Sequence, residues 1–158
     1  MTAVILHRLV LAGTTIIAMS LTAPALGQDR MVLGPRQFEQ DKSGAGAVLC
    51  SWALYLSIQA QTAACALPRQ PTDDAIDQAI TAIDDFILAN SSLHPTRAAL
   101  EAFKREATAR DRDQVSRQPQ FCTRPDLERF RSMKPERVKA SVRALLAVPR
   151  EPVMNPCL

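Results

Sequence analysis

The chain has 158 residues, of which 47% are hydrophobic, and its 19 basic and 16 acidic side chains give a formal net charge of +3. This length is enough for one domain with one core. The sequence has no Walker phosphate-binding loop, no G-x-G-x-x-G and no G-x-S-x-G motif, so it carries no signature of a nucleotide-binding protein or an α/β-hydrolase.

Residues 1–27 predict a secretory signal peptide. Arg8 precedes an uncharged, mostly apolar run over residues 9–21, and small residues follow that run. This order is typical of an exported chain, and cleavage fits after either Ala25 or Gly27. The alternative is an uncleaved anchor, but the run is shorter than the roughly 20 apolar residues of a membrane-spanning helix. We therefore expect a periplasmic or secreted protein with no stable membrane span after cleavage.

A flexible leader is expected next, over residues 28–46, because Gly-Pro and Gly-Ala-Gly stand there among polar residues. A single helical domain is expected over residues 47–158. Its first helix, residues 47–67, has no charged side chain and is apolar nearly all round, which predicts a buried central helix. The alternative is a transmembrane helix, but five Ser, Gln and Thr residues lower its hydropathy.

The second helix is expected over residues 72–90. Thr72 belongs to the preferred N-cap residues, and Asp73 and Asp74 follow in the first turn, where negative charge suits the helix dipole. Isoleucines then recur at helical spacing, namely Ile76, Ile80, Ile83 and Ile87. This stripe predicts the buried face of the helix.

Two further helical stretches are expected, over residues 95–114 and 125–148. Pro95 suits the first turn of the third helix, whose inward residues are expected to be Leu100, Phe103 and Ala107. The fourth stretch is interrupted before Pro135, and its apolar residues are Leu127, Phe130, Val138, Val142, Leu145 and Val148. Prolines exclude regular structure in the tail, residues 149–158. The fold class is therefore all-α, a small antiparallel bundle of about four helices.

The four cysteines, all beyond the signal peptide, predict two disulfides, because an even cysteine number in an exported chain is typical of them. Cys50 and Cys65 stand about 22 Å apart along one predicted helix, and a disulfide requires Cα atoms within roughly 7 Å. In an up-down bundle, the loop with Cys122 lies at the end that holds Cys65, and the tail brings Cys157 to Cys50. We therefore predict the pairs Cys65–Cys122 and Cys50–Cys157.

No residue pattern indicates a catalytic, cofactor or metal site. The cysteines form no C-x-x-C pair, which a redox role would normally show. His94, the only histidine after cleavage, is expected to be an N-cap or an exposed loop residue before Pro95. Asp73, Asp77 and Asp84 are expected to form a solvated acidic face. Neither a metal nor a cofactor is therefore expected.

Charge is unevenly distributed along the chain. Residues 28–96 contain four basic and eight acidic side chains, whereas residues 97–143 contain thirteen and seven. This asymmetry indicates either two solvated helix faces or a contact surface for an acidic partner. The most basic stretch consists of Arg124, Arg129, Arg131, Lys134, Arg137, Lys139 and Arg143. Only Phe130 is an aromatic residue within it, and with export this argues against a nucleic-acid partner.

A few sequence features resemble those of the Rap1a/Tai-type periplasmic immunity proteins. They are a helix with Trp52 between Cys50 and Cys65, then Phe121-Cys122 followed by Pro125, and the closing Pro156-Cys157. The long segment between Cys65 and Cys122 departs from that pattern. The resemblance implies a periplasmic protein that binds a protein partner.

These observations favour a non-enzymatic periplasmic or secreted binding module, whose partner is a protein or an envelope component. The basic region and the Pro-rich segment 149–156 are the candidate contact surfaces. The alternative is a small periplasmic enzyme whose site is built from dispersed carboxylates or His94.

Overall fold

All the regular secondary-structure elements among the described residues are helices. The computed structural model describes residues 35–157, so the predicted signal peptide over residues 1–27 lies outside the described part. The elements are η1 (Pro35–Phe38), α1 (Val48–Ala64), α2 (Pro71–Asn90), α3 (Arg97–Arg117), η2 (Pro119–Thr123), α4 (Pro125–Arg131) and α5 (Pro135–Leu145). The predicted all-α class is therefore confirmed.

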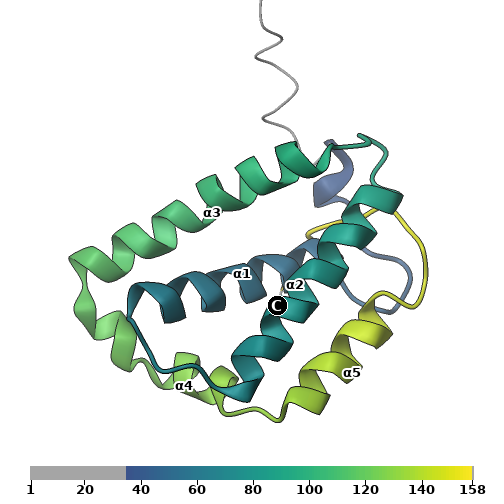
Figure 1. The fold of residues 1–158 in the computed structure, drawn as a ribbon. Helices are drawn as coiled ribbons and strands as arrows, with labels where there is room; N and C mark the ends of the chain where they lie inside the picture. The colour runs from purple at the N-terminus through teal and green to yellow at the C-terminus, as the bar shows by residue number, and fades with distance from the viewer. Residues whose placement is uncertain (1–34, 158) are drawn as a thin grey trace, which may run out of the picture.

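The helices form a small bundle around α1. α2 and α3 pack against α1, and α5 packs against α2 on the side away from α3. Successive long helices reverse direction, so that α1 and α3 run one way while α2 and α5 return (Figure 1). This arrangement is the predicted antiparallel bundle. It places the short helix α4 at one end, where the chain passes from α3 to α5.

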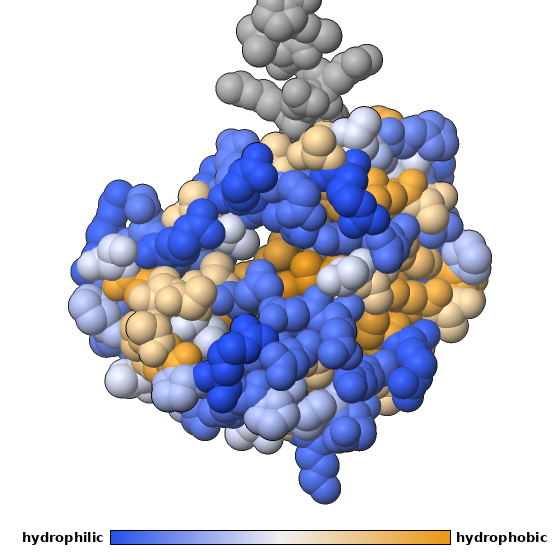
Figure 2. Space-filling model, in the orientation of Figure 1, coloured by the Kyte–Doolittle hydropathy of each residue, from blue (hydrophilic) through white to orange (hydrophobic). Residues whose placement is uncertain are grey.

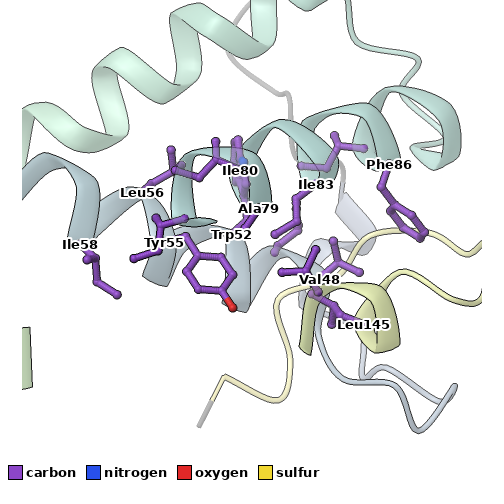
Figure 3. Packing of buried hydrophobic residues seen from close by; sticks show 14 of the residues in the cluster. Val48, Trp52, Tyr55, Leu56, Ile58, Ala79, Ile80, Ile83, Phe86 and Leu145 are labelled. Carbon is purple, nitrogen blue, oxygen red and sulfur yellow. The ribbon is translucent and has the colours of Figure 1, made fainter. Parts of the chain in front are cut away.

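α1 is central because its sequence offers apolar side chains in every direction. Val48, Leu49 and Trp52 are at most 1% exposed, and residues of α2 and α5 surround them. Figure 3 shows these helices meeting, with Val48 of α1 close to Leu145 of α5. No helix of the described residues combines the length and the hydropathy needed to cross a bilayer.

The isoleucine stripe of α2 is buried as predicted, with each of Ile76, Ile80, Ile83 and Ile87 at most 5% exposed. The predicted N-cap is wrong, because the helix begins at Pro71 and Gln70 takes the N-cap position. Thr72 lies within the first turn, and its hydroxyl donates to the backbone carbonyl of Met133 instead. Thr72, which was expected to cap the start of α2, thus links this helix to the α4–α5 connection.

α3 begins later than predicted, and two of its three expected inward residues are confirmed, because Leu100 is fully buried and Phe103 packs against the core. Thr96 is its N-cap and accepts a hydrogen bond from the backbone N–H of Ala99 at 3.1 Å. Ala107, predicted to face inward, is exposed, whereas Thr108 is buried. The inward face of α3 also carries Lys104 and Asp111, which bond to side chains of α2 and α1. The inward face of α3 is therefore partly polar, which its apolar periodicity alone did not indicate.

The predicted fourth stretch, residues 125–148, is interrupted before Pro135 as expected, and it forms the two helices α4 and α5. Ser132 to Lys134 separate α4 from α5, because Pro135 lacks a backbone N–H and disfavours helical geometry in the residue before it. Val138, Val142 and Leu145 are buried, as predicted. Val148 lies beyond the end of α5 and is 48% exposed, so its assignment to the buried stripe was wrong.

Two disulfides close the fold. Cys50 bonds to Cys157 and Cys65 bonds to Cys122, with Cα–Cα distances of 5.2 and 5.5 Å. These are the pairs that follow from placing Cys50 and Cys65 at opposite ends of one helix. The first bond attaches the tail to the start of α1, and the second attaches η2 to its end.

The described part of the predicted leader, residues 35–46, packs against the C-terminal tail, in contrast to the flexible segment expected. The carboxylate of Asp41 is 2% exposed and lies 2.6 Å from the guanidinium of Arg150. Arg150 also donates to the carbonyl of Gly46. Val153 in the tail is buried and accepts from the backbone N–H of Leu49. Both ends of the described chain therefore belong to the domain.

Candidate functional site: a basic groove at α4 and α5

The core contains a polar network around Asp84 of α2. Its carboxylate accepts a hydrogen bond from Trp52 Nε1 at 2.8 Å and pairs with the ammonium group of Lys104. Lys104 also lies 2.7 Å from Glu101, and the Trp52 ring stacks on Phe103 with centroids 5.6 Å apart. Burial lowers the pKa of Lys104, but the hydrogen bonds to both carboxylates outweigh it and hold the pKa above its ordinary value. The network joins three helices.

A second buried ion pair joins α4 to the start of α2. Arg131 donates to both carboxylate oxygens of Asp73, at 3.1 and 2.9 Å, and the backbone N–H of Gln70 donates to the same carboxylate. Burial raises the pKa of Asp73, but the bonds from Arg131 and Gln70 outweigh it and hold the pKa below its ordinary value. This pair is a structural contact rather than a reactive one.

The carboxylates of the enzymatic alternative that come together do so around cations, Asp84 and Glu101 at Lys104 and Asp74 and Asp77 at Arg69. His94 is an exposed turn residue with φ of 46°, and Thr96 rather than His94 caps α3. A general acid at neutral pH requires a raised carboxyl pKa. The pKa of Asp73 is lowered, and so is that of Asp41, where bonds from Ser43 and Arg150 outweigh burial. Residues 35–157 also contain no group of three His, Cys, Asp or Glu side chains placed to hold a metal ion.

The acidic side chains of residues 35–96 are neutralised by cations of the same chain. Every acidic residue between positions 35 and 96 forms a salt bridge, and these residues are Glu39, Asp41, Asp73, Asp74, Asp77, Asp84 and Asp85. The predicted solvated acidic face therefore has to be corrected. Asp73 and Asp84 are buried in ion pairs, and the exposed carboxylates of Asp74 and Asp77 share the guanidinium of Arg69.

The basic half is not neutralised in the same way. α4, α5 and the residues between them carry five exposed cationic side chains that have no salt bridge within residues 35–157. They are Arg129, Lys134, Arg137, Lys139 and Arg143. The uneven charge of the sequence thus becomes a surface of net positive charge at one end of the bundle, where these five cations outnumber the exposed Glu128 and Glu136.

Three of these cations surround a groove of about 680 Å³. Arg129 stands in the last turn of α4, Lys134 in the connection and Arg137 in the first turn of α5. The half-buried side chains of Phe130 and Met133 line the same groove and pack against the core. We call these five residues the basic groove. Figure 2 shows hydrophilic residues covering the lower edge of the molecule, where α4 and α5 lie in Figure 1.

Pro135 is what bends the chain around this groove. It ends the helical path after α4 and starts α5, while the ion pair between Arg131 and Asp73 holds α4 against α2. Thr72 also holds the α4–α5 connection in place, because its hydroxyl donates a hydrogen bond to the carbonyl of Met133. The backbone that carries the three cations is therefore held against α2 by the ion pair of Arg131 and by the hydrogen bond of Thr72.

The basic stretch could be identified from the sequence, but the sequence does not show which of its cations are buried or paired and which are free to bind a partner. Arg131 is 2% exposed and belongs to the core, and Arg124 pairs with Asp126 at 3.1 Å. The other five cations remain available. The apolar lining by Phe130 and Met133 was missed, because the sequence analysis counted Phe130 only among the apolar residues of the fourth stretch and gave Met133 no role. The Pro-rich tail, the other candidate contact region, is partly buried, with Val153 5% exposed.

A pocket of about 380 Å³ on α3 is lined by Arg110 and by the ion pair of Asp113 and Arg117, and two further pockets involve α1. One of about 500 Å³ lies between the end of α1 and α2, where the rim charges of Arg69 and Asp77 bond to each other at 2.7 Å. The other, of about 230 Å³, lies between α1 and α3 beside Trp52 and Phe103. It is the hollow with an apolar floor in the middle of Figure 2. None of these three pockets presents several unpaired charges.

Comparison with known proteins gives no relative. No family model matches the chain, and no curated protein or solved structure matches it either. The resemblance to the Rap1a/Tai-type immunity proteins therefore rests only on the few residues that suggested it. What the protein does must be inferred from its own residues.

Proposed function

We propose that the protein is an exported, non-enzymatic interaction module, which binds a negatively charged protein or envelope component through the basic groove. The observation that carries this proposal is the contrast in pairing. All seven acidic residues between positions 35 and 96 are matched by cations, whereas Arg129, Lys134 and Arg137 surround a groove and have no salt bridge within the described residues.

Export is supported by two independent features. Residues 1–27 have the composition of a secretory signal. Two disulfides hold the domain, and such bonds persist in oxidising compartments such as the periplasm or the extracellular space. A structure closed by these bonds is a rigid support for a surface that must remain folded outside the cytoplasm.

An electrostatic role has physical consequences that can be measured. Exposed cations contribute modestly one by one, about 0.2–1 kcal/mol per ion pair, so that three together change affinity by roughly threefold to 150-fold. Because the groove is open to solvent, binding should weaken as salt screens these charges. A partner should bind more quickly at low ionic strength.

The test is titration of the mature protein with fluorescein-labelled poly-glutamate, followed by fluorescence anisotropy. The variant Arg129→Gln/Lys134→Gln/Arg137→Gln neutralises the three cations of the groove and is expected to bind at least about threefold more weakly. The matched control removes the same charge elsewhere, in Lys42→Gln/Arg105→Gln/Arg110→Gln, at exposed residues without salt bridges in the described part of the chain. Equal losses in the two triple variants, or no binding by the wild type, would refute the proposal.

A further inference from the structure

The basic groove has an apolar floor, and a site for simple anions does not require one. Phe130 and Met133 are half-buried between the cations and the core. Interfaces gain most of their affinity from apolar groups that are removed from water at the centre, surrounded by polar groups at the rim. Cations around a recessed aromatic ring and a thioether have this arrangement. Methionine in particular adapts its shape to different apolar side chains.

Building on the proposed function, we infer that the groove binds an acidic segment of a protein partner, in which an apolar side chain lies between carboxylates. The apolar side chain enters the groove over Phe130 and Met133, and the flanking carboxylates reach Arg129 on one side and Arg137 on the other. The volume of about 680 Å³ lies within the range of about 300–1,000 Å³ that is usual for ligand pockets. It is large enough for one bulky side chain together with part of its backbone.

A lipid surface fits these residues less well. Proteins that bind anionic membranes through amphipathic helices place large apolar side chains beyond the cations, so that they enter the bilayer. The large apolar residues exposed on the described surface are Phe38, Leu54, Leu93 and Val148, and none of them lines the groove. The apolar atoms of the groove are recessed instead.

A second copy of this chain is also a poor occupant. Its most acidic surface is α2, where Asp74 and Asp77 are already paired with Arg69 and Asp85 with Arg97. A second copy would have to break these pairs in order to supply carboxylates from α2. Its exposed carboxylates without a salt bridge within the described residues are Glu106, Glu128 and Glu136, and each stands beside cations of the same helix that would repel the cations of the groove. The charge complementarity therefore favours a different molecule, which carries unpaired acidic residues.

The experiment compares two short fluorescein-labelled peptides of equal negative charge, which differ only in a central residue that is leucine in one and serine in the other. Anisotropy titrations of the wild type are expected to show about tenfold or tighter binding of the leucine peptide, the effect of burying one aliphatic side chain. The variant Met133→Gln should lose this preference while its affinity for the serine peptide stays the same. Met133→Leu, which keeps the floor apolar, should retain the preference.

The possible outcomes separate this inference from the proposed function. Equal affinity for the two peptides, both dependent on Arg129, Lys134 and Arg137, would overturn the inference and leave an electrostatic module. Groove-dependent binding to vesicles of equal parts phosphatidylglycerol and phosphatidylcholine, with no binding of either peptide, would also overturn it in favour of a lipid surface. If neither peptide nor these vesicles bind, the proposed function fails as well. Circular dichroism of each variant establishes that it is folded.

Discussion

Arg131 and Asp73 form a bidentate ion pair that attaches α4 to the first turn of α2. Arg131 Nη2 lies 2.9 Å from Asp73 Oδ2, and the two side chains are 3% and 8% exposed. The residues are 58 positions apart in the chain. One of the seven cations in the most basic stretch is thereby removed from the surface and becomes the contact that positions the rest.

Replacing Arg131 with leucine is expected to lower the free energy of unfolding by about 3–5 kcal/mol, because the carboxylate of Asp73 would remain buried without its partner. Urea denaturation followed by circular dichroism measures the loss. The control is Arg124→Leu, which breaks an exposed ion pair with Asp126 and should cost no more than about 1 kcal/mol. Losses of similar size in the two variants would contradict a structural role that is specific to Arg131.

The same pair predicts a loss of stability in acid. The pKa of Asp73 lies below its unfolded value of 3.8, so the ion pair contributes fully above that value, and the contribution is lost as pH falls through the folded pKa. The difference in unfolding free energy between the wild type and Asp73→Asn should be constant from about pH 7 to pH 5 and should narrow below about pH 4. Urea midpoints across this range test it, and a difference independent of pH would refute it.

The network around Asp84 predicts strong coupling between two side chains. Lys104→Met leaves the buried carboxylate with Trp52 as its only bonded partner among the described residues, and should cost about 2–3 kcal/mol. Asp84→Asn in the same chain removes the unpaired charge but keeps an acceptor for Trp52, so the double variant should recover at least half of the loss. Fluorescence of Trp52, the only tryptophan, follows unfolding directly. Additive effects of the two substitutions would show that the pair is not coupled.

The fold could be predicted from the sequence wherever local periodicity or chain geometry decides the outcome. The isoleucines of α2 recur on one face and are buried together. Cys50 and Cys65 are held apart by the helix between them, which left only two ways to pair the four cysteines, and the alternating helix directions chose one. These inferences need only the dimensions of a helix and the order of the elements.

The features that escaped prediction depend on contacts between distant residues. Thr72 looked like an N-cap, and no local signal shows that its hydroxyl bonds to Met133. Lys104 of α3 pairs with Asp84 on another helix, a contact that no local pattern indicates. The basic groove was hidden for the same reason, since a sequence cannot tell which cations have buried partners. Arg131 and Arg129 look alike in the chain, and only packing distinguishes them.

The two disulfides are expected to protect different parts of the molecule. They join residues 107 and 57 positions apart, and in the chain-entropy model each contributes about 4–5 kcal/mol by restricting the unfolded chain. Replacing either pair with serines should therefore lower the stability by similar amounts. The regions that become mobile should differ, because one bond holds the tail and the other holds η2 beside α4.

Hydrogen exchange of the serine variants tests this directly. Without the bond between Cys65 and Cys122, faster exchange is expected over residues 119–131, and the affinity of the basic groove for poly-glutamate should fall, because α4 loses one of its two anchors. Without the bond between Cys50 and Cys157, exchange should increase over residues 149–157 while the affinity stays unchanged. The second variant is the control for the first, since both lose a disulfide. If loss of the bond at Cys50 weakens poly-glutamate binding equally, the groove depends on overall stability rather than on the local bracing of α4.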